Sequence, residues 1–119
     1  MSYESTTTFV NVTCEASCLT VEFNRPDALN AFRPEMLSEA ARLIEQAGID
    51  EKVSVIVLRG AGRAFSAGVD LKVLQGIAPQ GGIIGDVFDE PAARLASAIR
   101  QSNVPVIARA WHPMNTLKQ

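Results

Sequence analysis

The sequence predicts an α/β domain in which pairs of strands alternate with helices. Three observations carry this prediction. Short apolar runs rich in β-branched residues have the length of strands, and two longer stretches repeat apolar residues at helical spacing. A glycine turn, with Gly60 and Gly62, follows one of the apolar runs directly. The 119 residues suffice for one domain with one hydrophobic core.

The first predicted element is a hairpin, formed by strands over residues 9–14 and 18–23. Cys14 and Cys18 flank its turn. A disulfide between them is disfavoured in a reducing compartment. A metal site is also disfavoured, because it would need two more ligands and His112 is the only histidine. We therefore interpret both cysteines as small strand residues.

A helix is predicted over residues 34–47, after a polar loop around Pro26. Pro34 suits the first turn of a helix, where its missing N–H costs nothing, and Gly48 suits the position where a helix stops. The predicted helix carries one apolar face, made of Leu37, Ala40, Ala41, Ile44 and Ala47.

The second half of the chain repeats strand and helix. A strand over residues 53–58 is expected to be broken by the glycine turn, and residues 69–74 are expected to form a short helix. The loop over residues 76–85 is either a lid over an apolar ligand tail or a plain surface connection. A last strand is predicted over residues 104–110, after a helix over residues 86–102.

Pro91 lies within that last predicted helix and either opens it or kinks it. The helix places three larger apolar residues on one face, namely Phe88, Leu95 and Ile99.

The composition excludes several functional classes. Apolar residues make up 47% of the chain, charged residues 20%, and the net charge is −2, as in an ordinary soluble globular protein. This charge does not predict a nucleic-acid surface, and no apolar run is long enough to span a membrane. The first residues show no basic region followed by an apolar one, so we expect no secretory signal and a cytoplasmic location.

We expect the chemistry at residues 53–71, where a strand, a glycine turn and a helix start follow one another. This order of elements aims backbone N–H groups into a crevice at the carboxyl end of the strand. Such groups bind negative charge, either standing on a phosphate or developing on an oxygen.

Three familiar sites of this kind fit the sequence poorly. A dinucleotide site needs a third glycine where Phe65 stands, and a P-loop needs a Gly-Lys-Ser/Thr that does not follow. A serine-hydrolase elbow around Ser66 needs glycine at Ala64 and a nearby base. Asp70 is either a general acid or base or, the interpretation that we prefer, a charge that stabilises the start of a helix.

Several segments, in their order and spacing, resemble the enoyl-CoA hydratase/isomerase (crotonase) family. They are N-R-P at 24–26, A-L-N-A at 28–31, V-I-V-L at 55–58, A-F-S-A-G-V-D-L at 64–71 and P-V-I-A at 105–108. The resemblance covers residues 19–110. It implies a crotonase-like β-β-α spiral truncated to its first repeats, with a partial domain over residues 1–110 and an atypical tail over residues 111–119.

The resemblance also implies an activity. Members of the family bind acyl-CoA thioesters, with coenzyme A as part of the substrate and no further cofactor or metal, in fatty-acid or related metabolism. They act as lyases or isomerases and stabilise an enolate oxyanion with two backbone N–H groups, one of which maps onto Ala67. One such donor is worth on the order of 3 kcal/mol in the transition state. The implied groove for CoA and the thioester comprises Arg25, Ala28, Leu29, Ala64, Ser66, Ala67, Gly68, Val69, Asp70, Leu71 and Lys72.

Two of these groove residues carry positive charge. Arg25 and Lys72 either reach the CoA phosphates or are solvated surface charges. Small residues at Ala64, Ala67 and Gly68 allow backbone, rather than side chains, to face the thioester.

The sequence departs from the family after the last strand. Trp111, His112 and Pro113 stand where the glycine-rich turn with the second oxyanion donor is expected, and no Asp or Glu follows Glu90 to replace the hydratases' paired glutamates. We therefore expect this truncated chain to be inactive, to expose apolar faces and to self-associate or form a homo-oligomer. The alternative is a non-catalytic remnant or interaction module that binds CoA or a full-length relative.

Overall fold

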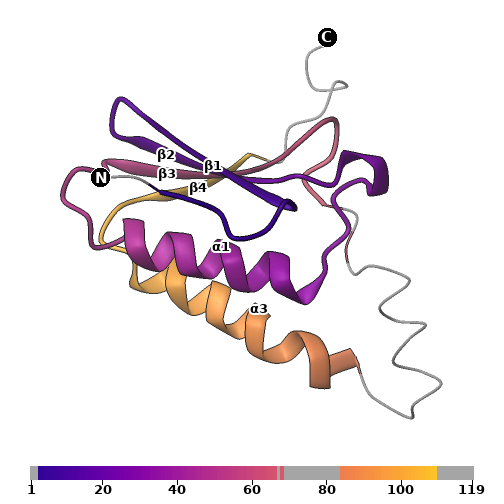
Figure 1. Ribbon diagram of the computed structural model, residues 1–119. Helices are drawn as coiled ribbons and strands as arrows, with labels where there is room; N and C mark the ends of the chain where they lie inside the picture. Colours follow the sequence, from indigo (N-terminus) through magenta and orange to yellow (C-terminus); the bar gives the residue numbers. More distant parts are fainter. Residues whose placement is uncertain (1–2, 67, 69–83, 110–119) are drawn as a thin grey trace, which may run out of the picture.

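In a computed structural model, residues 3–66, 68 and 84–109 are described, and they form a sheet covered on one face by helices (Figure 1). The elements, in chain order, are β1 (Val10–Glu15), β2 (Cys18–Phe23), the 3₁₀ turn η1 (Pro26–Ala28), α1 (Pro34–Ala47), β3 (Val55–Gly60), α3 (Ile84–Gln101) and β4 (Val106–Arg109).

The sheet has the strand order β1-β2-β3-β4. β1 and β2 form the predicted antiparallel hairpin, whose turn residues Ala16 and Ser17 have φ values of 51° and 69°. Two positive φ angles in a two-residue turn match the twist of the flanking strands. β2, β3 and β4 are parallel, and parallel neighbours need a crossover, which α1 provides between β2 and β3. This arrangement confirms the predicted α/β class, although among the described residues a strand pair precedes only the first helix and single strands flank α3.

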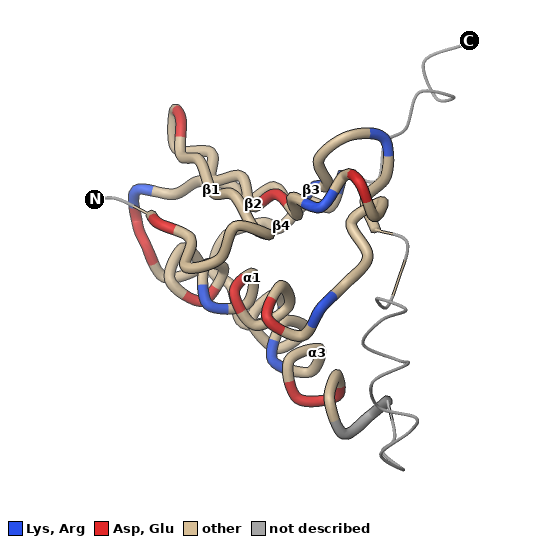
Figure 2. The backbone as a smooth tube through the Cα atoms, turned by 45° about the vertical axis from the view of Figure 1, so that its right-hand side comes forward, with Lys and Arg blue, Asp and Glu red and all other residues tan. Residues whose placement is uncertain are grey.

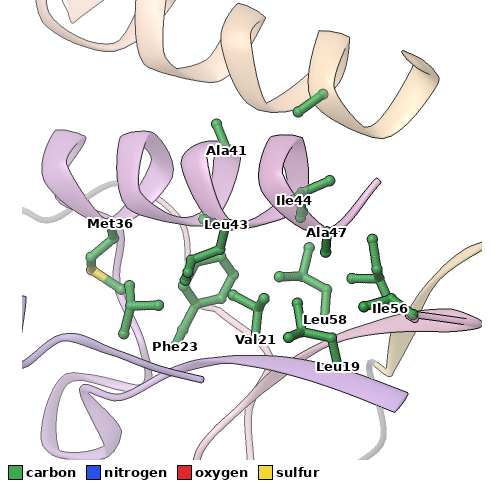
Figure 3. Packing of buried hydrophobic residues seen from close by; sticks show 14 residues of the cluster. Leu19, Val21, Phe23, Met36, Ala41, Leu43, Ile44, Ala47, Ile56 and Leu58 are labelled. Atoms are coloured by element: carbon green, nitrogen blue, oxygen red, sulfur yellow. The ribbon is translucent and has the colours of Figure 1, made fainter. Parts of the chain in front are cut away.

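The hydrophobic core lies between the sheet and α1 (Figure 3). β2 and β3 alternate buried and half-buried residues, so each presents one face to the helix. From the strands, the core receives Leu19, Val21, Phe23, Ile56 and Leu58; α1 contributes Met36, Leu43, Ile44 and Ala47, among others. The predicted apolar face of α1 is confirmed, because all five of its residues are buried.

α3 packs against the far side of α1 rather than on the sheet, so that α1 forms the middle of three layers (Figure 1). Acidic and basic residues are interspersed along both helices (Figure 2). Arg94 of α3 donates to Glu45 of α1 at 2.8 Å, across the outer surface of the pair. Within the described part of the chain, no helix has the length and apolar character needed to cross a membrane.

The segment before β1 is fastened to α1 by a buried carboxylate. Glu39, only 5% exposed, accepts a hydrogen bond from the Thr6 backbone N–H at 2.6 Å. Arg42 donates to the same carboxylate at 2.8 and 3.0 Å and also to the Glu4 carbonyl at 2.6 Å. These bonds hold the pKa of Glu39 at about 2, because each of them favours the ionised form.

The structure corrects several predicted boundaries. The strand predicted over residues 53–58 is β3 and runs from Val55 to Gly60, so Gly60 is its last residue and not part of the turn that follows. The last strand is shorter than predicted, and α3 begins at Ile84, inside the predicted loop 76–85. Pro91 lies inside α3 and therefore does not open it. The predicted helix at 69–74 and the remainder of that loop fall outside the described residues.

Candidate functional site

Two loops meet at the carboxyl edge of the parallel strands. One loop, residues 24–31, follows β2, and the other, the turn at residues 61–66 and 68, follows β3. The strands end together because Phe23 and Gly60 are the last paired residues of β2 and β3. Carboxyl ends of adjacent parallel strands are where α/β sheets place their ligands.

Asn30 joins the two loops. Its side chain is fully buried, and its Oδ1 accepts a hydrogen bond from the Arg25 backbone N–H at 2.7 Å. Its Nδ2 donates to the Ala61 carbonyl at 2.8 Å and to the Ala64 carbonyl at 2.7 Å. Three polar backbone groups of two separate loops are thus satisfied by one amide, which replaces the water that burial excludes.

Gly60 lets the turn fold back over the end of β3. A Cβ at this position would lie 2.2 Å from the Ala64 carbonyl oxygen and 2.5 Å from that of Phe65. No side chain fits at that distance, so the close approach of turn and strand requires glycine. The sequence predicts a glycine turn at this position, and the structure shows the contact that requires the glycine.

Phe65 faces the core instead of the crevice. Its ring packs edge-on against Phe23 with centroids 5.6 Å apart, and Phe23 makes the same kind of contact with Phe32 at 5.0 Å. Such edge-to-face pairs are favourable because a positive ring edge meets a negative ring face. With the aromatic ring turned inward, the turn anchors on the core next to the residues implied to bind substrate.

Ser66 and Gly68 shape the next part of the turn. The Ser66 hydroxyl accepts a hydrogen bond from the Gly68 N–H at 3.1 Å, and the Gly68 carbonyl accepts one from the Phe32 N–H at 2.6 Å. Gly68 has a φ of 100° and open space where a Cβ would lie, so glycine is needed here for its backbone conformation alone. Ser66 therefore contributes a hydrogen bond to the turn and is more than a small packing residue.

Arg25 is engaged within its own loop. Its Nη1 donates to the Ala31 carbonyl at 2.7 Å, and its guanidinium lies 5.1 Å from the centre of the Phe9 ring. Both contacts restrain the first loop. The two predicted roles of Arg25, phosphate ligand or solvated surface charge, stay predictions. The other described groove residues lie at the same edge: Ala28 and Ala64 are half-buried and Leu29 is 37% exposed.

The remaining predicted site residues lie outside the described part of the chain: Ala67, Val69, Asp70, Leu71 and Lys72. Their roles stay predictions. Among the described residues, no three His, Cys, Asp or Glu side chains come together as a metal site would require. Both cysteines are free thiols. The described edge therefore offers backbone groups and small side chains.

Sequence reasoning missed one residue that builds this edge. The A-L-N-A motif includes Asn30, but the sequence predicts none of its long-range hydrogen bonds. A local signal exists, since asparagine tolerates the left-handed backbone, and Leu29 and Asn30 have φ values of 51° and 57°. That signal predicts a turn and not the partners of the side chain.

The profile described as enoyl-CoA hydratase/isomerase matches residues 13–110 of the chain. The 1,2-epoxyphenylacetyl-CoA isomerase of Escherichia coli is 36% identical over 84 residues, which are 67% of this chain and 32% of that enzyme. The 3-hydroxyisobutyryl-CoA hydrolase-like protein 5 of Arabidopsis thaliana is 46% identical over 50 residues, which are 42% of this chain and 13% of that protein.

Solved structures share the fold. An enoyl-CoA hydratase/carnithine racemase of Magnetospirillum magneticum superposes with a TM-score of 0.78 at 28% identity, over 92% of this chain and 41% of that one. An enoyl-CoA hydratase of Mycobacterium avium subsp. paratuberculosis superposes with a TM-score of 0.71 at 28% identity, over 87% of this chain and 36% of that one. The chain thus spans about a third of the E. coli relative and less than half of these structures. With the profile matched over most of its length, the chain belongs to the enoyl-CoA hydratase/isomerase family and has the crotonase fold in its first repeats.

Proposed function

We propose that this chain binds an acyl-CoA thioester at the carboxyl edge of β2 and β3 and stabilises an enolate oxyanion with the backbone N–H of Ala67. The observation that supports this proposal is the turn after β3, which is fixed from two sides. Asn30 holds its start through the Ala61 and Ala64 carbonyls, and Phe32 holds Gly68 through a 2.6 Å hydrogen bond.

A turn fixed in this way suits an oxyanion donor. A backbone N–H stabilises developing charge only when it points to the position that the oxyanion will take, and a donor held before the reaction pays no cost of reorganisation. Small side chains at Ala64 and Gly68 leave room for the thioester. In this proposal Ala28, Leu29, Ser66 and residues 69–72 line the groove for the CoA and thioester parts of the substrate.

For the reaction, we propose a chemical class rather than one substrate. The relatives include an isomerase, hydratases and a hydrolase-like protein, and their names state CoA thioesters as substrates. We propose acyl-CoA chemistry of the lyase or isomerase kind. We also propose that the 119-residue chain does not turn over substrate by itself, because the second donor and the paired glutamates have no counterpart in its sequence.

Titration of the chain with crotonyl-CoA, followed by calorimetry, tests the binding part of the proposal. Gly68→Ala should weaken binding by about tenfold or more, since a Cβ meets no atom there and the change acts only by forcing the φ of 100° elsewhere. Gly48→Ala, at the far end of α1, controls for a loss of stability away from the site, because its Cβ would lie 3.0 Å from the Ile44 carbonyl oxygen and from the Ser102 hydroxyl, and it should bind as the unaltered chain does. Equal affinities for all three proteins would contradict the proposed site.

A second candidate is an interaction module that associates with a further copy of itself or with a full-length relative. Its support is apolar surface on the described residues: Ile107 of β4 is 51% exposed and Ile49, after α1, is 75% exposed. A groove of about 360 Å³ adds to this surface, lined by Phe32, Leu37, Phe88, Ala92, Leu95, Ala96 and Ile99. Contiguous exposed apolar surface marks interaction sites, and this groove is the contiguous part of that surface. Sedimentation of the chain over a range of concentrations, alone and with a full-length relative, tests this candidate.

A further inference from the structure

We infer that Asn30 is a positioning residue, whose buried amide sets the place of the turn that carries the oxyanion donor. The inference rests on the proposed function and adds a residue to it. Asn30 contacts no substrate in this proposal. It acts through the Ala61 and Ala64 carbonyls, which it draws toward the loop after β2.

The amide has no spare donor. Both N–H bonds of Nδ2 are used, one for Ala61 and one for Ala64, and Oδ1 accepts from the Arg25 N–H. With the side chain fully buried, water cannot replace any of these bonds. An aspartate would set a carboxylate against two carbonyl oxygens, and an apolar residue would leave three backbone groups unpaired. Asparagine is the side chain that offers one acceptor and two donors in this geometry.

The position of Asn30 along the chain explains why the turn cannot shift. Ala64 is pulled toward Asn30 by the 2.7 Å bond and approaches Gly60 so closely that no Cβ fits between them. Two residues after Asn30, the Phe32 N–H holds the Gly68 carbonyl at 2.6 Å. The segment between Ala64 and Gly68 is therefore held at both ends by one stretch, residues 30–32. Ala67 lies within this segment in the sequence.

The place of this turn matters for function because an oxyanion donor works only at short distance from the developing charge. Donors to an oxyanion must be placed within about 0.5 Å, and a misplacement of 1 Å costs about a hundredfold in rate. Loss of the Asn30 amide should therefore impair polarisation of the thioester carbonyl more than it impairs folding. A purely structural asparagine would impair both in proportion.

The test uses Asn30→Gly, because glycine keeps the φ of 57° and removes only the side-chain bonds. Two controls separate the effects. Asn24→Gly removes an amide from the same loop that donates only to the Thr8 carbonyl, at 3.3 Å. Ile44→Val destabilises the core of α1 without contacting the turn. Circular dichroism and thermal melts establish that each variant is folded and how far its Tm falls.

The readout is the infrared stretch of a ¹³C-labelled thioester carbonyl in crotonyl-CoA bound to the protein, together with the affinity. In the unaltered chain and both controls, binding should lower the carbonyl frequency. In Asn30→Gly at least half of this shift should be lost, and the affinity should fall by about tenfold, even when Ile44→Val has the lower Tm. An unchanged shift in a folded Asn30→Gly would overturn the inference.

Gly60→Ala provides a second test if Asn30→Gly does not fold. Its Cβ would lie 2.2 Å from the Ala64 carbonyl oxygen and 2.7 Å from Asn30 Nδ2, so the change should displace the turn and the amide together and also abolish the shift. A folded Gly60→Ala with a normal shift would contradict transmission through Ala64. If the unaltered chain binds crotonyl-CoA without any shift, the proposed oxyanion site fails, and the inference about Asn30 fails with it. If the unaltered chain and the variants all show the full shift, the site stands and the inference alone is wrong.

Discussion

Two buried polar residues, Asn30 and Glu39, each fasten a segment that has no regular structure of its own. Asn30 is fully buried and Glu39 is 5% exposed. Both satisfy backbone groups, Asn30 in the two loops at the site and Glu39 in the segment before β1. A neutral amide needs only partners, whereas a buried carboxylate also needs a countercharge, which Arg42 supplies. Only the second fastening depends on pH.

Stability should therefore fall in acid through Glu39. Its pKa is lowered from 4.5 to about 2, so the folded state gains stability from the ionised form above pH 4.5 and loses it as pH falls toward 2. The gain amounts to about 3 kcal/mol at neutral pH. We expect the free energy of unfolding, measured with urea, to fall less between pH 7 and pH 3 in Glu39→Gln than in the unaltered chain.

Glu45→Gln is the control for that comparison. Glu45 lies on the same helix, and its pKa is also lowered, by Arg94, but both partners are about 40% exposed. Solvent screens such a pair, so this change should alter stability by less than about 1 kcal/mol at either pH. If Glu39→Gln and Glu45→Gln gave the same acid sensitivity, the buried carboxylate would not be the pH-dependent group.

At the scale of elements, α1 is the centre of the fold. Its residues are buried on both sides, toward the sheet and toward α3, whereas β1 and β4 are edge strands of the described sheet. A helix between two layers contributes apolar contacts on most of its circumference. The hairpin, by contrast, depends on its own turn, where Ala16 and Ser17 adopt positive φ angles without being glycine.

Leu43→Ala should be among the costly core changes. The side chain is fully buried between α1 and the strands, so its loss removes transfer free energy and leaves a cavity, for about 2–5 kcal/mol. Ile49→Ala, at a residue 75% exposed, should change the free energy of unfolding by less than about 0.5 kcal/mol. Denaturant titrations of both variants check this difference, and equal losses would place α1 outside the core.

The hairpin turn should accept a stabilising change. Ser17 has a φ of 69°, and glycine adopts such angles without the steric cost of a Cβ. Its carbonyl, which accepts from the Ser54 N–H at 2.8 Å, is kept in Ser17→Gly. We expect Ser17→Gly to raise stability by about 0.5–1 kcal/mol, measured as a higher Tm. A lower Tm would show that the hydroxyl matters more than the backbone strain.

At the scale of the whole molecule, the exposed edge of the described sheet carries an apolar residue, Ile107, which is 51% exposed. β4 pairs with β3 on one side only within the described sheet, and its residues 107–109 are exposed. Exposed strand edges pair readily with other chains. This edge supports the proposed self-association.

Ile107→Lys should weaken that association. A charge at a position 51% exposed on the edge strand opposes pairing with a second copy, and we expect the dissociation constant to rise by at least tenfold. Ile49→Lys removes a comparably exposed apolar residue away from the sheet and serves as the control. Analytical ultracentrifugation measures both, and a monomeric unaltered chain at all concentrations would contradict the proposal.

The sequence by itself determined the elements whose signals are local. The strand over residues 18–23 and the helix over residues 34–47 have the predicted bounds, because alternation, Pro34 and Gly48 act within one element. The family also followed from sequence, since its motifs occur in a fixed order, and the profile match confirms it. The role of Ala67 came from that resemblance and stays a prediction.

Only the tertiary structure decided how the motifs work together. The ends of β3 depend on pairing with β2, which no local pattern records, so the strand starts and stops two residues later than predicted. Asn30 and Ala64 lie 34 residues apart and meet because parallel strands bring both loops to one edge. Burial then makes the hydrogen bonds between them necessary, because water cannot replace them.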